Sequence, residues 1–278
     1  MADVSKAILI TGCSTGIGRT TALRLASRGH NVYASARNLD SIRDLADAGC
    51  KILALDVCNE ASIRAAVDQV EAAEGAVGAL VNNAGYGQDG AIEEVPMDAV
   101  RKQFETNVFG LVRLTQMVMP GMRRQGYGRI VNVSSMGGKL VFPGGGFYHA
   151  TKFAVEAISD ALRWEVRDFG IRVSVIQPGP IKTQFEATSV GSMDGTASAS
   201  PYANFNASVG KRVRATYEGP MAASPDGVAR AIERAITSRR PRSRYPVTAA
   251  ARMLMTTRRL LPDGGWDAMM SMQFERPK

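Results

Sequence analysis

The stretch KAILITGCSTGIG, residues 6–18, joins a short apolar run to a glycine-rich turn. A helical pattern follows it and stops at Gly29. Strand, turn and helix in this order bring backbone N–H groups and a helix N-terminus to one point, where a diphosphate can bind. The spacing G-x-x-x-G-x-G differs from the common dinucleotide fingerprint G-x-G-x-x-G, so the turn alone is also compatible with a purely structural role.

A second apolar run, residues 31–36, ends in Ala36 and Arg37. In nucleotide-binding sheets an acidic group at this position favours a ribose hydroxyl, whereas a basic group favours a ribose phosphate. Ala36 stands where an acid would favour NAD, and the guanidinium of Arg37 suits a phosphate. The sequence therefore predicts NADP(H) as the cofactor, with an ordinary surface charge as the alternative for Arg37.

Apolar runs and helical patterns continue to alternate along the chain. Further strands are expected at 51–55, 79–81, 129–133 and 171–176, with helices between them. Parallel strands need such crossovers, so we predict an α/β fold, a doubly wound parallel sheet of the Rossmann type with helices on both faces. We expect residues 1–278 to form a single domain, since open α/β sheets reach this size around one core.

The stretch SSMGGKLVFPGGGFYHATK, residues 134–152, carries the candidate chemistry. Tyr148 and Lys152 are four residues apart, so a helix beginning near Phe147 places both on one face. A lysine cation favours the phenolate of a nearby tyrosine, whose ordinary pKa near 10 makes it a poor acid or base. Ser135 follows a predicted strand and can hold a substrate oxygen beside the phenol, which suggests proton transfer to a carbonyl or alcohol. Tyr148 and Lys152 alone are also compatible with a solvated surface pair.

The chain changes character after residue 183. Residues 189–210 are rich in Ser, Gly, Ala and Asn, so we interpret 184–224 as a substrate lid, with plain disorder of 189–210 as the alternative. A helix is expected from 225 to 239, then a solvated basic turn from Arg239 to Arg244. A C-terminal helical extension is expected at 247–275. Its apolar stripes suggest core or subunit contact, and they are Ala250, Met253, Leu254, Thr257, Leu261, Trp266, Met269 and Met270.

Composition limits the classes of function. No apolar run is long enough to span a membrane, and residues 1–12 lack a secretory pattern, so we expect a cytoplasmic protein. Three cysteines without a C-x-x-C favour reduced thiols, and two histidines leave zinc sites and a Ser-His-Asp triad without enough residues, so no metal is expected. The net charge of +8 falls in the region from Lys211 onward, which has fourteen Lys and Arg against six Asp and Glu.

These motifs together resemble the short-chain dehydrogenase/reductase family. The resemblance runs from Lys6 to Thr183 and rests on six motifs in order, namely T-G-x-x-x-G-I-G at 11–18, N-N-A-G at 82–85, Asn107, Ser135, Y-x-x-x-K at 148–152 and P-G-x-x-x-T at 178–183. It implies that Tyr148 exchanges a proton with the substrate oxygen, that Ser135 binds that oxygen, and that Lys152 lowers the pKa of Tyr148 and holds the nicotinamide ribose. Asn107 is implied to interrupt its helix, so that a backbone carbonyl and a water link Lys152 to solvent.

The resemblance also implies the residues that hold the cofactor. Those expected to bind NADP(H) are Gly12, Ser14, Thr15, Gly16, Ile17, Gly18, Arg37, Asp56, Val57, Asn83, Gly85, Tyr148, Lys152, Pro178, Gly179, Ile181 and Thr183. Among them, Arg37 with Ser14 or Thr15 would hold the 2'-phosphate. His149 is expected to point away from the chemistry because it adjoins Tyr148 in sequence.

Within the family, the pattern is similar to 17-beta-hydroxysteroid and retinol dehydrogenases, and to bacterial oxidoreductases of unassigned substrate. The pocket candidates are mostly apolar, which favours a lipophilic ketone or alcohol, and they are Tyr86, Met136, Val141, Phe142, Phe147, Pro180 and Phe185. A non-catalytic nucleotide-sensing or interaction protein is the alternative. We expect a homodimer or homotetramer and no nucleic acid partner, because the basic tail lacks interleaved aromatic residues, while its charge permits peripheral membrane contact.

Overall fold

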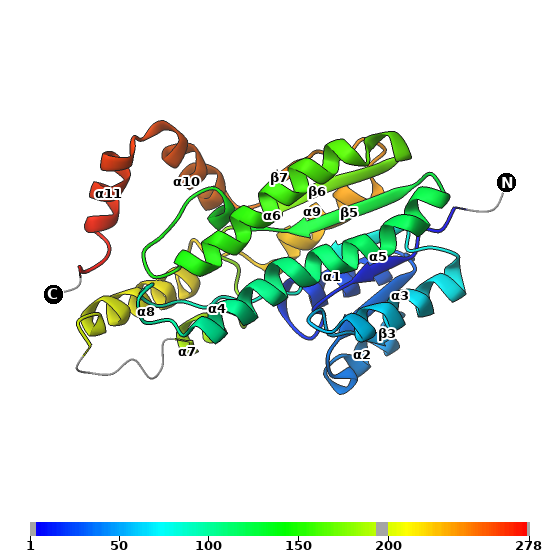
Figure 1. Cartoon of the computed structure of the whole chain (residues 1–278), viewed down its shortest axis with the longest axis horizontal. Helices are drawn as coiled ribbons and strands as arrows, with labels where there is room; N and C mark the ends of the chain where they lie inside the picture. The colour runs from blue at the N-terminus through cyan, green and yellow to red at the C-terminus, as the bar shows by residue number, and fades with distance from the viewer. Residues whose placement is uncertain (1–3, 193–199, 277–278) are drawn as a thin grey trace.

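The computed structural model describes residues 4–192 and 200–276, and these form one parallel sheet with helices packed around it (Figure 1). All neighbouring strands pair in parallel, in the order β3-β2-β1-β4-β5-β6-β7. The strands are β1 (Ile8–Ile10), β2 (Val32–Ala36), β3 (Lys51–Ala54), β4 (Ala79–Asn82), β5 (Gly128–Val133), β6 (Ile171–Gln177) and β7 (Arg244–Pro246). This arrangement confirms the predicted doubly wound α/β fold.

Helices connect the strands and cover both faces of the sheet. They are α1 (Gly16–Ala26), α2 (Arg43–Asp47), α3 (Glu60–Glu74), α4 (Met97–Phe104), α5 (Gly110–Arg124), α6 (Gly146–Glu165), α7 (Phe185–Gly191), α8 (Ala203–Glu218), α9 (Pro225–Thr237), α10 (Ala249–Leu260) and α11 (Asp263–Ser271). Short 3-10 turns lie at Leu39–Ile42, Met136–Gly138 and Arg167–Phe169, and a π-helical turn at Glu105–Phe109. The predicted C-terminal helical extension thus corresponds to α10 and α11.

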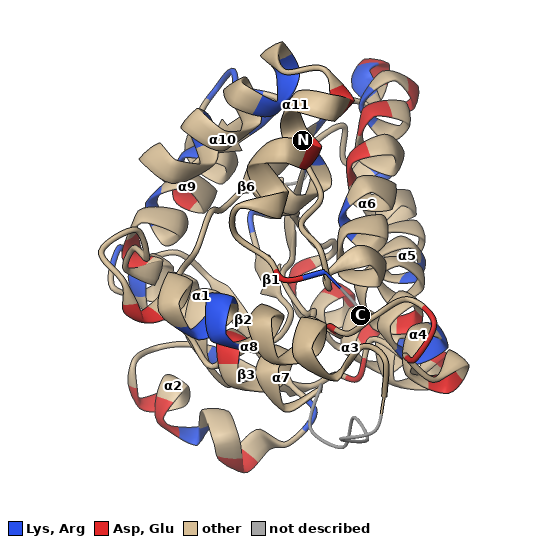
Figure 2. Ribbon diagram, turned by 90° about the vertical axis from the view of Figure 1, so that its left-hand side faces the viewer, with Lys and Arg blue, Asp and Glu red and all other residues tan. Residues whose placement is uncertain are grey.

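Each central strand is buried on both faces because its alternate residues enter two separate cores. In β1, Ile8 and Ile10 pack with α1, α2 and α9, whereas Leu9 packs with α3, α5 and the end of α6. Figure 2 shows the sheet between these two helix layers. Burial on both sides explains why the strands appear in the sequence as continuous apolar runs rather than alternating ones.

The order of the strands determines where a ligand can bind. The chain adds β2 and β3 on one side of β1, and then β4 to β7 on the other. In open parallel sheets the crevice at such a reversal, beyond the carboxyl ends of the strands, is the usual ligand site. Here the loops that follow β1 and β4 meet at this point, and both carry sequence motifs.

Two expectations about the second half of the chain were wrong. Residues 239–244 are not simply a solvated turn, because Arg244 begins β7 and its guanidinium binds Glu156 and Asp160 of α6 at 2.9 and 2.5 Å. The small and polar residues of 189–210 predict little burial, but α8 begins at Ala203 and buries Val209. The end of α7, up to Gly191, also falls in that stretch, while residues 193–199 lie outside the described residues.

The C-terminal helices bury fewer residues than their apolar stripes suggest. In α10 the buried residue is Ala251, while Met253 of the predicted stripe is 57% exposed. In α11, Trp266 and Met270 are buried, as expected, in a small cluster with Leu140. Within the described residues, no helix is both long and apolar enough to cross a membrane.

Candidate active site

A cavity of about 730 Å³ opens at the carboxyl ends of the central strands. It begins at the glycine turn after β1, passes the ends of β2 and β4, and reaches Ser135, Tyr148 and Lys152. Side chains of α7 and α8, among them Phe185 and Tyr217, form its far wall. The helices of the predicted lid thus line the same cavity as the predicted catalytic residues, while the lid function itself stays a prediction.

The turn between β1 and α1 has the form of an anion cradle. Gly12 and Gly16 adopt positive φ angles of 71° and 56°, and a Cβ on Gly12 would lie 3.0 Å from the Cα of Ala84. The N-cap residue Thr15 makes no side-chain cap, and the first turn of α1 contains no acidic residue. The N–H groups at this helix start therefore keep their capacity for an acceptor, and the helix dipole favours an anion there.

The loops after β1 and β4 are fastened to each other. Thr11 Oγ1 accepts hydrogen bonds from the backbone N–H groups of Asn83 and Ala84 at 3.0 and 2.9 Å. The Asn83 amide in turn donates to the carbonyl oxygens of Thr11 and Gly12 at 2.8 and 3.1 Å. Asn83 lines the cavity as predicted, but its side-chain amide hydrogen bonds stabilise the turn.

Most residues expected to bind the cofactor line this one cavity. They are Gly12, Ser14, Thr15, Gly16, Ile17, Arg37, Asp56, Val57, Asn83, Gly85, Tyr148, Lys152, Pro178, Gly179, Ile181 and Thr183. Gly18 does not, because it packs beneath the turn, where an added Cβ would lie 2.3 Å from the carbonyl oxygen of Gly12. The lining also contains the buried Ser134 hydroxyl, which has no hydrogen-bond partner within the described residues. A glycine cradle, an uncapped helix start and an unpartnered hydroxyl along one cavity fit a dinucleotide.

Tyr148 and Lys152 lie together on the start of α6. The Lys152 ammonium is 5.8 Å from the centroid of the Tyr148 ring and donates a 2.9 Å hydrogen bond to the carbonyl oxygen of Val133 at the end of β5. Ser135 follows β5, and it lines the same cavity as Tyr148. The Ser135 hydroxyl is held in place by accepting a 3.0 Å hydrogen bond from the backbone N–H of Gly137.

Burial has the largest influence on the pKa values of Tyr148 and Lys152. It raises the pKa of Tyr148 to about 12, against the lowering effect of the Ser135 hydrogen bond, and it lowers the pKa of Lys152 to about 8. The direction for Tyr148 is opposite to the lowering expected from Lys152, because desolvation is the largest influence and the nearby Asp89 adds to it. At neutral pH the chain therefore holds a protonated phenol beside a lysine that is mainly cationic.

Asn107 lies behind the cavity rather than in its wall, in the π-helical turn Glu105–Phe109. Its side-chain oxygen accepts a 3.0 Å hydrogen bond from the Tyr86 N–H, and its amide donates to the Tyr86 carbonyl at 2.9 Å and to Thr151 Oγ1 at 3.1 Å. The helix is interrupted at Asn107, in line with the resemblance. π-Helical turns of this kind are frequent at functional sites.

His149 fixes the segment that follows Ser135. Its Nδ1 lies 3.0 Å from the Gly137 carbonyl oxygen, and its Nε2 accepts a 3.1 Å hydrogen bond from the Phe142 N–H. These partners require a neutral ring with the proton on Nδ1, and burial lowers the pKa of His149 to about 4. The side chain points away from the cavity, as the sequence suggested.

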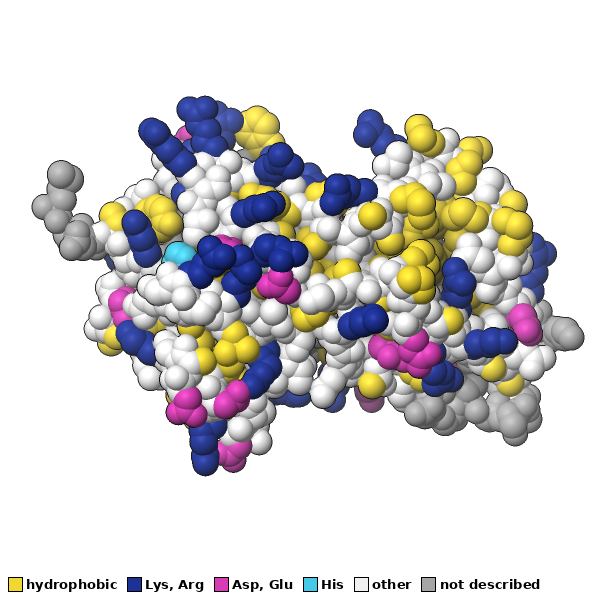
Figure 3. Space-filling model, turned by 180° about the vertical axis from the view of Figure 1, so that it is seen from behind, with side chains coloured by type: hydrophobic (Ala, Val, Ile, Leu, Met, Phe, Trp, Pro, Cys, Tyr) yellow, Lys and Arg dark blue, Asp and Glu magenta, His cyan; other side chains and the backbone are white. Residues whose placement is uncertain are grey.

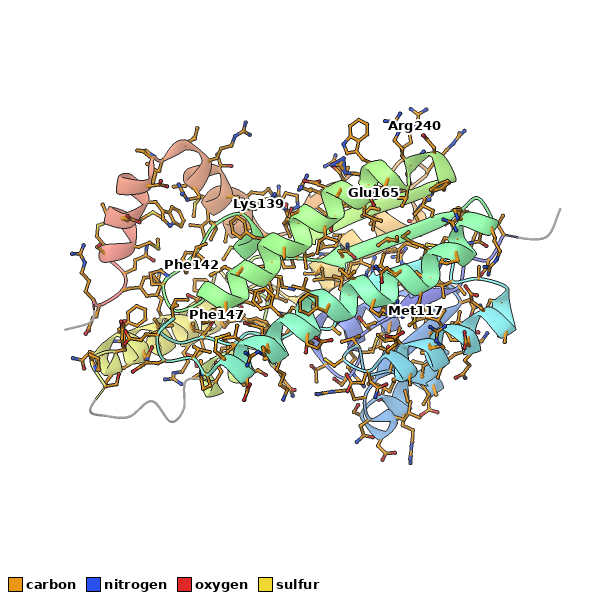
Figure 4. The ribbon with its side chains drawn as sticks, in the orientation of Figure 1. Met117, Lys139, Phe142, Phe147, Glu165 and Arg240 are labelled. Atoms are coloured by element: carbon orange, nitrogen blue, oxygen red, sulfur yellow. The ribbon has the colours of Figure 1, made fainter. Side chains whose placement is uncertain are left out.

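Only two of the seven apolar pocket candidates line the cavity. Tyr86 and Phe185 line the cavity, and the Phe185 ring lies 5.3 Å from that of Tyr148. Val141 and Phe142 face α11 instead, where the Phe142 ring lies 6.1 Å from that of Trp266. Figure 4 shows Lys139 and Phe142 between α6 and the C-terminal helices. Met136, Phe147 and Pro180 do not line the cavity.

Two titratable residues near Tyr148 were missed by the sequence analysis. Tyr217 of α8 lines the cavity and stacks on Phe185 at 6.3 Å. Asp89 is buried, binds the Ser189 hydroxyl, and has its pKa raised to about 6 by burial. Asp89 lies in a loop and Tyr217 in α8. Neither directly follows a strand, so the motif spacings of the sequence could not identify them.

Comparison with known proteins agrees with this geometry. Residues 6–193 match the family model described as short chain dehydrogenase. The uncharacterised oxidoreductase YbbO of Escherichia coli K12 is 37% identical over 96% of this chain and 94% of its own length. Bovine retinol dehydrogenase 8 is 37% identical, over 67% of this chain and 62% of its own.

The fold comparison extends over nearly the whole chain. A crystal structure of a short-chain dehydrogenase from Streptomyces avermitilis has a TM-score of 0.79 and 33% identity, covering 96% of this chain and 95% of that one. The matched region contains the glycine turn, Ser135, Tyr148 and Lys152. This chain belongs to the short-chain dehydrogenase/reductase family of NAD(P)-dependent oxidoreductases.

Proposed function

We propose that this protein reduces a lipophilic ketone, or oxidises the corresponding secondary alcohol, with NADP(H). The observation that carries the proposal is the cavity shared by the glycine turn, Ser135, Tyr148 and Lys152. A dinucleotide held by the turn reaches along this cavity to the three polar side chains. The whole reaction adds a hydride to the carbonyl carbon and a proton to its oxygen.

The residues of the chain carry the proton and position the oxygen. Ser135 donates a hydrogen bond to the substrate oxygen, and Tyr148 donates its phenolic proton to that oxygen as the alcohol forms. Lys152 stabilises the resulting phenolate and, from its place against β5, holds the nicotinamide ribose. The bound nicotinamide supplies or accepts the hydride. Because the phenol is protonated at neutral pH, Tyr148 is ready to act as the acid in the reduction.

The cofactor preference is proposed from the end of β2. Ala36 is buried there and Arg37 is exposed, lines the cavity and has no ion pair with any described residue. An arginine at this position can bind a ribose phosphate, whereas no carboxylate from β2 is present to bind a ribose hydroxyl.

Replacing Arg37 tests this preference. Losing one charge-assisted contact of about 1.5–3 kcal/mol should weaken NADPH binding by roughly 10- to 100-fold in Arg37→Ala and leave NADH binding unchanged. Arg252→Ala, which removes an exposed arginine of α10, is the matched control. Fluorescence titration with both cofactors measures the ratio, and an unaltered ratio in Arg37→Ala would remove the basis for NADP(H).

The substrate class is proposed from the far wall of the cavity. Phe185, Tyr217 and Tyr86 present aromatic surface next to Tyr148. Retinol dehydrogenase 8, by its name, acts on a lipophilic alcohol, which supports the same class here. Spectrophotometric assay of NADPH oxidation with ketones of increasing chain length tests the proposal, and the expected result is a rise in kcat/KM with apolar length.

A non-catalytic nucleotide-sensing protein is the competing function. It predicts tight NADPH binding without turnover of any ketone or alcohol in the same assay. The presence of Ser135, Tyr148 and Lys152 in one cavity favours the enzyme.

A further inference from the structure

A second cavity, of about 1080 Å³, lies on the other side of the segment that follows Ser135. Its floor is formed by Leu140, Val141 and Phe153, and its opposite wall by Trp266, Met270 and Phe274 of the C-terminal region. It shares no lining residue with the active-site cavity. Figure 3, which views the protein from behind, shows that hydrophobic side chains also gather on the outside of this C-terminal lobe.

The rim of the second cavity is strongly cationic. Five lining residues carry positive charge, and two, Asp267 and Glu275, carry negative charge; the cations are Lys139, Arg244, Arg258, Arg259 and Arg276. Arg258 binds Asp263 at 2.5 Å, but Arg259 is exposed and has no ion pair with any described residue. An apolar interior with a cationic mouth is complementary to an amphiphile that bears an anionic head group.

Two of these cations, Lys139 and Arg244, belong to a network of ion pairs with α6. Lys139 and Arg244 share the buried carboxylate of Glu156 at 3.1 and 2.9 Å, and Arg244 also shares Asp160 with Arg163. Three cations thus meet two carboxylates, and one of the three, Arg163, lies outside the lining of the second cavity. The Lys139 ammonium, with its side chain 38% exposed, has three N–H donors and can bind a second anion while it keeps its contact with Glu156.

The geometry points to a binding site for a long-chain carboxylate in this second cavity, separate from the active site. The carboxylate binds Lys139 and the arginines of the rim, and the alkyl chain lies against Trp266, Met270 and Phe153. The site requires no change in the catalytic residues. The segment between the two cavities is fixed on the active-site side by His149 and on the other side by the 3.2 Å hydrogen bond from Trp266 Nε1 to the Val141 carbonyl.

Quenching of Trp266 fluorescence tests the proposal directly. The chain has two tryptophans, so Trp164→Phe leaves Trp266 as the single reporter, and 11-bromoundecanoate below its micellar concentration serves as the probe. The expected result is saturable quenching at one probe per chain, with about tenfold weaker binding in Lys139→Met. Lys6→Met, which precedes β1 and does not line the second cavity, is the control and should bind as the parent does. Arg259→Gln provides a second variant at the exposed rim, where folding is not at risk.

Two further probes, with a neutral and a cationic head group, distinguish a carboxylate from other ligands. 11-Bromo-1-undecanol and a brominated alkyl trimethylammonium should quench at least tenfold less well. Equal quenching by the cationic probe, or no saturable quenching by the carboxylate, would overturn the proposal. The proposal would also be overturned if the protein sedimented as an oligomer and the probe quenched Trp266 only after the oligomer dissociated. A second copy of the chain would then cover the cavity.

Discussion

At the scale of single residues, Lys152 is buried although the proposed mechanism requires its side chain to be positively charged. Burial lowers its pKa to about 8, so its cationic form is complete well below pH 8 and is lost as the pH rises through that value. If the cation stabilises the Tyr148 phenolate, kcat/KM for ketone reduction should be flat near pH 6–7 and fall above an apparent pKa of about 8.

The control for this profile is Lys152→Arg. An arginine stays charged throughout the range, so its profile should remain flat, whatever its absolute rate. A decline at the same pH in both proteins would show that another group is responsible.

For His149 we predict an effect on stability, and in the opposite pH direction, because it is lost as the pH falls. Its pKa is lowered to about 4 in the folded chain, so between pH 6.5 and 4 the unfolded chain binds a proton that the folded chain does not. Stability is therefore present above pH 6.5 and is lost as the pH falls toward 4. At pH 4.5 the loss should be about 2 kcal/mol.

Urea unfolding at pH 7 and pH 4.5 measures this loss, with His149→Gln as the reference that cannot titrate. The parent should lose about 2 kcal/mol more than the variant between the two pH values. An equal loss in both proteins would mean that His149 is protonated, or not buried, in solution.

At the scale of elements, the turn between β1 and α1 depends on close backbone approach. A Cβ on Gly18 would lie 2.3 Å from the Gly12 carbonyl oxygen and 2.6 Å from the Asn83 amide, so α1 must shift to accommodate it. Gly18→Ala should cost about 1–3 kcal/mol of stability and weaken NADPH binding through distortion of the turn. Thermal unfolding and cofactor titration measure the two effects.

Gly264→Ala is the matched control, because an added Cβ in α11 meets no atom within 4 Å and the residue has no positive φ. It should be neutral or stabilising by up to about 1 kcal/mol. If Gly18→Ala were equally harmless, the contact between α1 and the turn would be looser than the structure indicates.

The elements that could be predicted from sequence are those buried on both faces. β1, β2, β4, β5 and β6 appear as apolar runs because two cores enclose them. β7 could not be identified in this way, because it is a half-buried edge strand whose Arg244 is held by ion pairs to α6 rather than by apolar burial. α8 was missed for a related reason, since its first half, up to Gly210, consists mostly of small or polar residues that conceal the face packing against Gly144 and α7.

At the scale of the whole molecule, the site forms where the chain reverses direction in the sheet. Gly12 and Ser135 are far apart in sequence, and their positions after β1 and β5 were enough to predict that they meet; Tyr148 follows Ser135 by thirteen residues, on the start of α6. Asp89 and Tyr217 could not be predicted, because they reach Tyr148 from a loop and from helix α8, whose placement depends on tertiary packing. The pKa of Tyr148 was also beyond sequence reasoning, since the degree of burial sets its direction.

The charge asymmetry has a similar explanation. The basic tail suggested by composition is not one uniform surface, because Arg230, Arg244 and Arg258 are engaged with carboxylates. The remaining cations of the tail are distributed over α8 to α11, and some surround the second cavity. The absence of a nucleic acid partner remains a prediction.

The central claim is that the Tyr148 phenol transfers the proton in a cavity that also holds the cofactor. Its most direct test is Tyr148→Phe, assayed for NADPH oxidation with the best ketone substrate of the parent and titrated with NADPH by fluorescence. Loss of one general acid should lower kcat at least 10²-fold, while the dissociation constant for NADPH changes less than about threefold. Full turnover in Tyr148→Phe would contradict the account.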